Sequence, residues 1–430
     1  MLSKLPDLLA LAAVVLPCWY VYKRSVWQGK VEINHVATFS FGFLFYWITP
    51  LVVRIYSGKL DFPLASVWSS MFREKLIVPY ALSCIVLYLC FALGDTVGLR
   101  LFHDKVTRPA PKVPRLALSV AVAAACVLMA YSGFVFRTAL FRPASPTDLN
   151  SQAARGAVTA CVVVLGMVAI VFTVDRPEIP WRKRLLSVYF LPFLLGMTLM
   201  VYLGSRLYAA SLLVMFAIYR SNFRARYKLK TVVAGTLIFA FFFGAVGMWR
   251  EEGSLTGAFF NVFEEPMLGS ISLVHHLRYK GISWINYPTQ LESDFENLIP
   301  TVLLPNKIDV LKKPDAYRPL GGLHSFVSFD LNFGILGSAL FWFLWPMGFR
   351  YLKSRCSSTL FATMYIMCSG WLTFTFFRDP FSISLVKAIL QYSILIPIAL
   401  VAFGRLLSLA CSSPNGAAAM LPAQPRMESL

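Results

Sequence analysis

Long runs of apolar residues, separated by short polar connections, dominate the chain. About eleven runs reach or approach the roughly 20 residues that an α-helix needs to cross a bilayer. This pattern predicts an all-α, polytopic membrane helix bundle with about eleven transmembrane helices. The runs are Leu8 to Tyr22, Val36 to Val53, Leu76 to Gly94, Leu116 to Phe136, Ala157 to Val174, Leu185 to Leu203, Leu207 to Tyr219, Val232 to Trp249, Phe333 to Phe349, Leu360 to Phe377 and Ser384 to Leu407.

One connection is far longer than the others. Between Trp249 and about Asn332 the chain leaves the apolar pattern for roughly 80 residues, whereas most connections have only a few. Proline and glycine recur through this segment, which favours a compact irregular lid with short helices over a strand-rich domain. The expected organisation is eight membrane helices in residues 1–249, one long extracytoplasmic loop in 250–332, three membrane helices in 333–409 and a disordered cytoplasmic tail in 410–430.

Composition and charge agree with a membrane protein. The chain has 57% hydrophobic and 14% charged residues, whereas soluble domains have roughly 25% charged residues. A net charge of +19 would suggest nucleic-acid binding in a soluble protein. Here the lysines and arginines lie mostly in short loops, and one set of alternate loops holds roughly twice as many as the other. The positive-inside rule makes the richer set cytoplasmic, so we expect an outer N-terminus, a cytoplasmic C-terminus and no nucleic-acid partner.

Two of the short outer connections carry an arginine as their single basic residue. Gly204-Ser205-Arg206 joins two apolar runs with almost no loop, so the guanidinium is expected at the mouth of the helix bundle. The competing interpretation is a solvated anchor at the end of a span. Arg378 lies in the stretch "FRDP" beside Asp379, and from the residues alone this pair is an ordinary ion pair.

His324 is the candidate for proton transfer. It follows Gly321 and Gly322, which permit unusual backbone conformations, and a neutral imidazole at the outer face could take a proton from a hydroxyl group. Asp330 could orient this ring. The alternative is a histidine that is hydrogen-bonded within the lid. His275 and His276 are adjacent and would diverge by about 100° on a helix, so we expect no metal site and no cofactor.

These landmarks, in this order, resemble the Wzy-type O-antigen or oligosaccharide repeat-unit polymerases, GT-C-like enzymes of bacterial inner membranes that are related to the O-antigen ligases. The resemblance rests on Gly204-Ser205-Arg206 before a short helix, the long late outer loop with "LIPTVLLPNK", the stretch "GGLHSFVSFDLNFGILG" and the final "FRDP". Many relatives have an arginine or Pro-Lys-Pro after the proline-rich run. Here Pro305-Asn306-Lys307 is followed by Lys312-Lys313-Pro314, which leaves the equivalent lysine open.

The resemblance implies a metal-independent glycosyltransferase at the periplasmic face of the bacterial inner membrane. Such an enzyme moves a glycan from one undecaprenyl-pyrophosphate carrier to the terminal sugar of another. The implied partners are the lipid-linked donor and acceptor, membrane lipids, a chain-length regulator and a flippase. Arginine suits the leaving pyrophosphate because it stays charged and forks onto phosphate oxygens. The implied catalytic residues are His324 and Asp330, and the implied substrate-binding residues are Ser205, Arg206, Arg250, Arg278, Arg318 and Arg378.

Other functions stay open at this stage. An O-antigen ligase, which transfers the glycan to the lipid A core, shares the layout. A lipid or polysaccharide transporter (flippase) would also place charges within a helix bundle, although no internal repeat is visible. A glycosidase would need a carboxylate pair, and the long loop offers candidates for one. These are Glu264, Glu265, Glu292, Asp294 and Glu296.

Overall fold

The fold is a bundle of apolar α-helices. The structure is a computed structural model that describes residues 5–56, 74–103, 113–135, 149–250, 258–295 and 323–411. In this part of the chain seven helices are long and apolar enough to cross a membrane, and shorter apolar helices accompany them. The prediction of an all-α, polytopic bundle is confirmed. The chain is therefore a multi-pass membrane protein.

Each predicted apolar run overlaps one to three of the observed helices. The first half of the chain forms α1 (Leu5–Ser25), α2 (His35–Gly42), the π-helix η2 (Phe43–Ile48), α3 (Thr49–Tyr56), α5 (Glu74–Leu101), α6 (Arg115–Val135), α8 (Leu149–Asp175), α9 (Trp181–Leu185), α10 (Leu191–Tyr202), α11 (Arg206–Phe223) and α12 (Leu229–Arg250). The second half forms α13 (Ala258–Tyr279), α14 (Thr289–Phe295), α16 (Ser325–Ser354), α17 (Thr359–Trp371), α18 (Thr375–Arg378), the π-helix η6 (Ser382–Leu395) and α19 (Ile396–Cys411).

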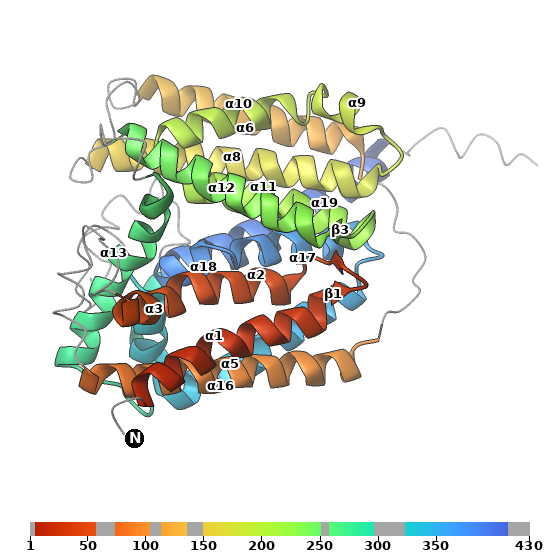
Figure 1. Cartoon of the computed structure of the whole chain (residues 1–430). Helices are drawn as coiled ribbons and strands as arrows, with labels where there is room; N and C mark the ends of the chain where they lie inside the picture. Colours follow the sequence, from red (N-terminus) through yellow and green to blue (C-terminus); the bar gives the residue numbers. More distant parts are fainter. Residues whose placement is uncertain are drawn as a thin grey trace, which may run out of the picture.

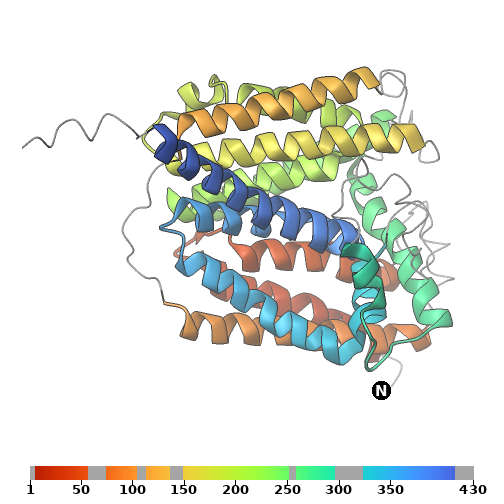
Figure 2. The same cartoon turned by 180° about the vertical axis from the view of Figure 1, so that it is seen from behind.

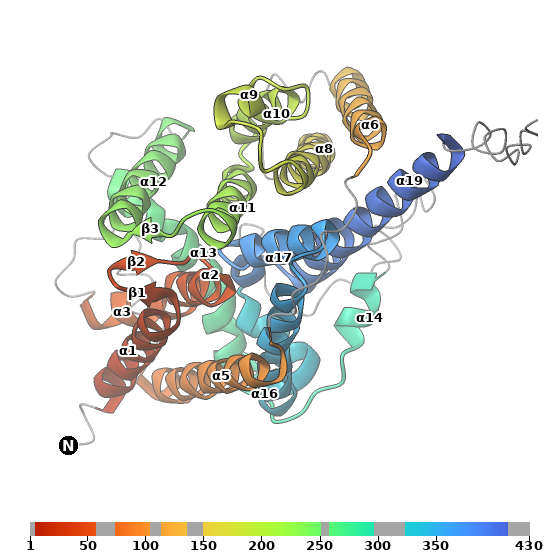
Figure 3. The same ribbon diagram turned by 90° about the vertical axis from the view of Figure 1, so that its right-hand side faces the viewer.

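The two ends of the bundle carry different structures (Figure 1). A small antiparallel sheet of β1 (Val26–Trp27), β2 (Lys30–Val31) and β3 (Tyr227–Lys228) lies at one end, which we call the sheet end. Helix α13 lies across the other end, which we call the α13 end. Figure 3, which looks along the bundle, shows that the sheet joins the connection after α1 to the connection before α12.

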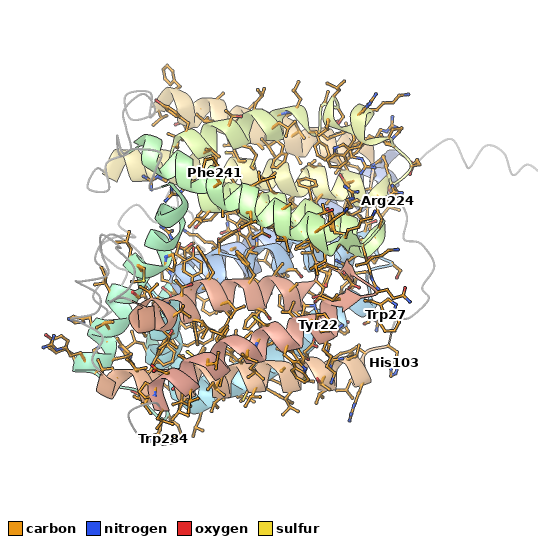
Figure 4. The ribbon with its side chains drawn as sticks, viewed as in Figure 1. Tyr22, Trp27, His103, Arg224, Phe241 and Trp284 are labelled. Atoms are coloured by element: carbon orange, nitrogen blue, oxygen red, sulfur yellow. The ribbon has the colours of Figure 1, made fainter. Side chains whose placement is uncertain are left out.

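Basic side chains gather at the sheet end. The last turn of α1 carries Lys23 and Arg24 just before β1, and the last turn of α11 carries Arg220 shortly before β3. Glu32, which follows β2, forms ion pairs with Arg226 and Lys353. Figure 4 places Arg224 and Trp27 at this end and Trp284 near the opposite end. Several loops that are rich in lysine and arginine therefore lie at the sheet end.

This arrangement leads to a topology prediction, in which the sheet end faces the cytoplasm and the α13 end faces outside. Cysteine substituted for Tyr287, which is 77% exposed after α13, should react with an impermeant maleimide added to spheroplasts. Cysteine substituted for the exposed Lys228 should react only after permeabilisation. The native cysteines are first replaced by serine or alanine. The reverse labelling pattern would put the α13 end in the cytoplasm.

Helix α16 begins earlier than the sequence predicted and is broken where the predicted span was to start. The run was expected to begin at Phe333, but the helix begins at Ser325 and has a non-helical residue at Gly334, with φ 63° and ψ −174°. At this break Ile335 and Leu336 donate backbone hydrogen bonds of 2.8 and 3.1 Å to the carbonyls of residues 283 and 284. A Cβ at Gly334 would lie 2.7 Å from backbone atoms of Trp284 and Ile285, so the chain after α13 packs into the break.

The long loop also differs from its predicted form. Instead of short helices only, it contains α13, a single helix of 22 residues. Pro266 lies within this helix without ending it, because a proline can kink a helix that tertiary packing supports. Helix α13 contacts α3, η2, α5 and α16. It therefore covers the ends of helices that belong to both halves of the chain.

Candidate functional site

The turn between α10 and α11 places Arg206 at the start of a membrane helix. Gly204 has a φ of 86°. The Ser205 N–H donates to Met200 O at 2.9 Å and the Gly204 N–H to Val201 O at 3.0 Å, which are the two bonds of a Schellman cap. Helix α11 begins at the next residue, so the positive end of its dipole lies beside the guanidinium. This end of α11 is electrostatically suited to an anionic group.

Hydrogen bonds tie this turn to other helices at the α13 end. Thr159 of α8 donates to Ser205 Oγ at 3.1 Å. Tyr208 of α11 donates to Asp379 Oδ2 at 3.3 Å, and Arg378 Nη1 donates to the other oxygen of the same carboxylate at 3.0 Å. The side chain of Arg378 is 30% exposed. The bond between Tyr208 and Asp379 thus joins the first turn of α11 to the end of α18, and each of these two segments carries one of the predicted substrate-binding arginines.

A histidine and an aspartate form a buried pair between α13 and α16. His276 Nε2 lies 2.8 Å from Asp330 Oδ2, and the side chains are 4% and 2% exposed. The other carboxylate oxygen accepts the Ser283 backbone N–H at 3.0 Å. Because a carboxylate only accepts hydrogen bonds, Nε2 carries the hydrogen and Nδ1 keeps a lone pair. Among the described residues Nδ1 has no hydrogen-bond partner, so this ring can accept a proton while the carboxylate orients it.

His324 makes different contacts from those that we expected from the sequence. Its Nδ1 accepts the Phe326 backbone N–H at 3.3 Å and its Nε2–H donates to the Tyr46 carbonyl at 3.1 Å, so it caps the start of α16. The residue is 1% exposed, and burial lowers the pKa of its imidazole to about 4. The expectation that Asp330 orients this ring is wrong, because Asp330 bonds to His276 instead.

Aromatic packing connects the two polar groups at the α13 end. Phe329, the neighbour of Asp330, packs edge-on against Phe381 with ring centroids 4.8 Å apart. Phe381 follows Asp379 by two positions. Figure 2 shows α13 and the start of α16 at this same end of the bundle. The histidine–aspartate pair and the arginine-bearing loop therefore flank one aromatic contact.

The remaining predicted site residues are not brought into this group by the described structure. Arg278 lies exposed on α13, with its guanidinium 5.6 Å from the centroid of the Tyr279 ring. Arg250 is the last residue of α12, and its side chain lies outside the described part. Arg318 also lies outside the described residues. Within the described ranges, no three histidine, cysteine, aspartate or glutamate side chains are grouped to hold a metal ion.

The sequence interpretation missed a buried charged cluster nearer the sheet end. Asp95 of α5 is 0% exposed and accepts two hydrogen bonds from Arg350 of α16, at 2.6 and 2.9 Å. It also bonds to His35 Nε2 at 2.9 Å and to the Tyr20 hydroxyl at 2.8 Å. The available signal was an aspartate at the end of an apolar run, since ionisable residues within membrane helices have specific partners. This cluster joins α1, α2, α5 and α16.

The α13 end therefore offers two kinds of chemistry. The start of α11 and Arg378 provide positive charge, and the pair of His276 with Asp330 provides an oriented proton acceptor. Comparison of the chain with protein-family models, with curated proteins and with solved structures finds no match to any of them.

Proposed function

We propose that the chain is a glycosyltransferase that polymerises oligosaccharide repeat units linked to undecaprenyl pyrophosphate, at the periplasmic face of the bacterial inner membrane. The observation that carries the proposal is the location of an oriented histidine and of Arg206 and Arg378 at one end of a membrane helix bundle. Glycosyl transfer from a lipid pyrophosphate needs both groups, because one must take a proton and the others must stabilise an anionic leaving group.

In the proposed reaction His276 Nδ1 takes the proton of an acceptor sugar hydroxyl while the hydroxyl oxygen attacks the anomeric carbon of the donor sugar. The bond between that carbon and the phosphate oxygen breaks, and its electron pair leaves with the pyrophosphate. Asp330 keeps the imidazole in place and balances the charge of the imidazolium. Arg206 and Arg378 stabilise the charge that develops on the pyrophosphate.

The test is to incubate the purified, reconstituted protein with lipid-linked repeat units. The proposal expects a ladder of products that increase by one repeat unit at each step. A single transfer to a lipid A core acceptor without a ladder would make the protein a ligase. Movement of the lipid-linked units across vesicles without new glycosidic bonds would make it a flippase. Either of these two results would overturn the polymerase proposal.

Arg206→Lys is expected to lower the rate of ladder formation on the order of 100-fold or more, the cost of losing one good electrostatic donor. Lysine keeps the charge but cannot bind two phosphate oxygens in a fork. The matched control is Arg226→Lys, because Arg226 pairs with Glu32 at the sheet end and is 44% exposed. This control should keep the wild-type rate. A near-normal rate in Arg206→Ala would indicate that Arg206 is a membrane anchor and does not bind the pyrophosphate.

A further inference from the structure

An apolar groove with a volume of about 700 Å³ lies between α1, α2, α11 and α12. In Figure 3 the pair α1 and α2 faces the pair α11 and α12 on one flank of the bundle. Hydrocarbon side chains make up most of the lining, and they include Val21, Phe41, Leu213, Val232 and Phe239. The helices that form it are those of a membrane bundle, so a lipid chain is the ligand class that this lining can bind.

The sheet closes the groove at the sheet end. Val26, Val31 and Tyr227 line the groove and pair with one another across the three strands, so they share one face of the sheet. The other residues of the strands lie on the opposite face and are exposed. These are Trp27, Lys30 and Lys228. The strand residues on the groove side of the sheet are therefore uncharged, although the Arg220 guanidinium lies 5.0 Å from the centroid of the Tyr227 ring.

The other end of the groove approaches the candidate site. Phe239 of α12 stacks on Phe374 with ring centroids 6.1 Å apart, and both side chains line the groove. Phe374 immediately precedes α18, the short helix that ends at Arg378. On α11 the lining begins at Leu213, about two turns or roughly 10 Å beyond Arg206 along the helix axis. Leu213 and Phe374 therefore place the groove within about two helix turns of Arg206 on α11 and four residues before Arg378.

We propose that this groove holds the distal part of a polyisoprenoid chain whose pyrophosphate head lies at Arg206 and Arg378. The inference rests on the proposed function and adds where the lipid tail binds. The groove continues along α12 from Phe239 to Leu229, roughly 15 Å. Adding the roughly 10 Å along α11 between Arg206 and Leu213 gives the length of the path from the arginines to the sheet. This length exceeds half of the roughly 30 Å thickness of the hydrocarbon core of a bilayer. The acyl chain of a lipid in the outer leaflet is too short to follow this path to its end. The head group of a lipid in the inner leaflet would lie at the end of the groove that the sheet closes.

Gly235 provides the test, because it lines the groove and a Cβ at this position would meet no atom within 4 Å. Gly235→Trp should fill the groove without moving the backbone. Binding of undecaprenyl pyrophosphate and of farnesyl pyrophosphate, which has the same head and a short chain, is measured by native mass spectrometry. The wild type should bind undecaprenyl pyrophosphate at least about ten-fold more tightly than farnesyl pyrophosphate. Burial of about two additional methylene groups is enough to give this difference. Gly235→Trp should lose this difference and keep its binding of farnesyl pyrophosphate.

Ile238→Trp is the matched control, because Ile238 lies on the same helix but is 70% exposed and does not line the groove. It should bind both pyrophosphates as the wild type does. As a second measurement that needs no substitution, an undecaprenyl pyrophosphate analogue with a diazirine at the end of its chain should label the groove residues of α2 and α12. Labelling confined to the outer surface of the bundle would overturn the proposal.

Two further outcomes would also overturn it. The first is a wild type that binds the two pyrophosphates equally well, or a Gly235→Trp variant that still binds undecaprenyl pyrophosphate more tightly than farnesyl pyrophosphate. The other is phosphatidylglycerol that co-purifies with the wild type and is lost from Gly235→Trp while undecaprenyl pyrophosphate still binds, which would assign the groove to a phospholipid. Because these probes carry no sugar, the result is separate from the polymerase proposal. A protein that discriminates chain length but makes no ladder refutes only the proposed reaction, and a normal ladder from Gly235→Trp refutes only the groove.

Discussion

His276→Gln is expected to lower the rate of polymer formation by roughly 100- to 10,000-fold, the usual contribution of a positioned base. Glutamine can still donate a hydrogen bond to Asp330, so the buried carboxylate keeps a partner and the protein should insert in normal amounts. It offers no basic nitrogen to the acceptor hydroxyl. The measurement is the initial rate of ladder formation by equal amounts of purified wild type and variant. A rate within about ten-fold of the wild type would exclude His276 as the base.

His275 provides the matched control for this substitution. It is the preceding residue on α13, but it is exposed and its ring packs on Tyr279 with centroids 4.6 Å apart. Because adjacent residues on a helix point about 100° apart, His275 does not reach the carboxylate that holds His276. His275→Gln should therefore make polymer at the wild-type rate. Loss of activity in both variants would indicate damage to α13 and would not identify a base.

His324→Gln separates the two histidine assignments. His324 joins the start of α16 to the Tyr46 carbonyl, so its replacement should lower the unfolding temperature. Because burial lowers its pKa from 6.5 to about 4, the stability that its neutral form contributes is complete above pH 6.5 and falls as the pH decreases toward 4. Two results together would identify His324 as the base. His324→Gln would make no polymer although its unfolding temperature is unchanged, and the rate of the wild type would fall only near pH 4.

The sequence predicted the membrane helices well because length and hydropathy are enough to define a span. It failed where a contact between distant segments decides the structure. The run of α5 was expected to end at Gly94, but the helix continues through Asp95 because Arg350 of α16 neutralises that carboxylate. The start of α16 was placed at Phe333, where the predicted apolar run begins. The structure shows that this glycine is a break inside a longer helix.

The candidate site was predicted in part for the same reason. Arg206 was recognisable as a charge between two apolar runs, Arg378 through the family resemblance, and Asp330 as a carboxylate near His324. The partner of Asp330 was not, since His276 lies 54 positions away and only the packing of α13 on α16 brings the two together. The adjacency of His275 and His276 argued against a shared metal ion, but it does not bear on pairing with a carboxylate. A single sequence therefore identified the aspartate and missed the histidine that it orients.

Asp95→Ala is expected to destabilise the protein by about 3–5 kcal/mol, the usual cost of breaking a buried ion pair from one side. The substitution removes the acceptor of both Arg350 bonds and of the bonds from His35 and Tyr20. The Arg350 side chain, which is 10% exposed, would keep its charge without a partner. The measurement is the unfolding free energy in detergent, together with the fraction of monodisperse protein on size-exclusion chromatography.

The double variant Asp95→Leu with Arg350→Met tests whether the cost comes from the stranded charge. Replacing both partners of a buried pair by apolar residues is often neutral, so the double variant should recover most of the stability lost in Asp95→Ala. Glu32→Gln is the comparison at the sheet end, because it removes the ion pairs with Arg226 and Lys353, whose side chains are 44% and 26% exposed. Exposed pairs are worth about 0–1 kcal/mol each, so this loss should be the smaller one. Equal losses from Glu32→Gln and Asp95→Ala would contradict the assignment of Asp95 as the main tie between α5 and α16. A double variant no more stable than Asp95→Ala would show that His35 and Tyr20, rather than Arg350, account for the requirement for the carboxylate.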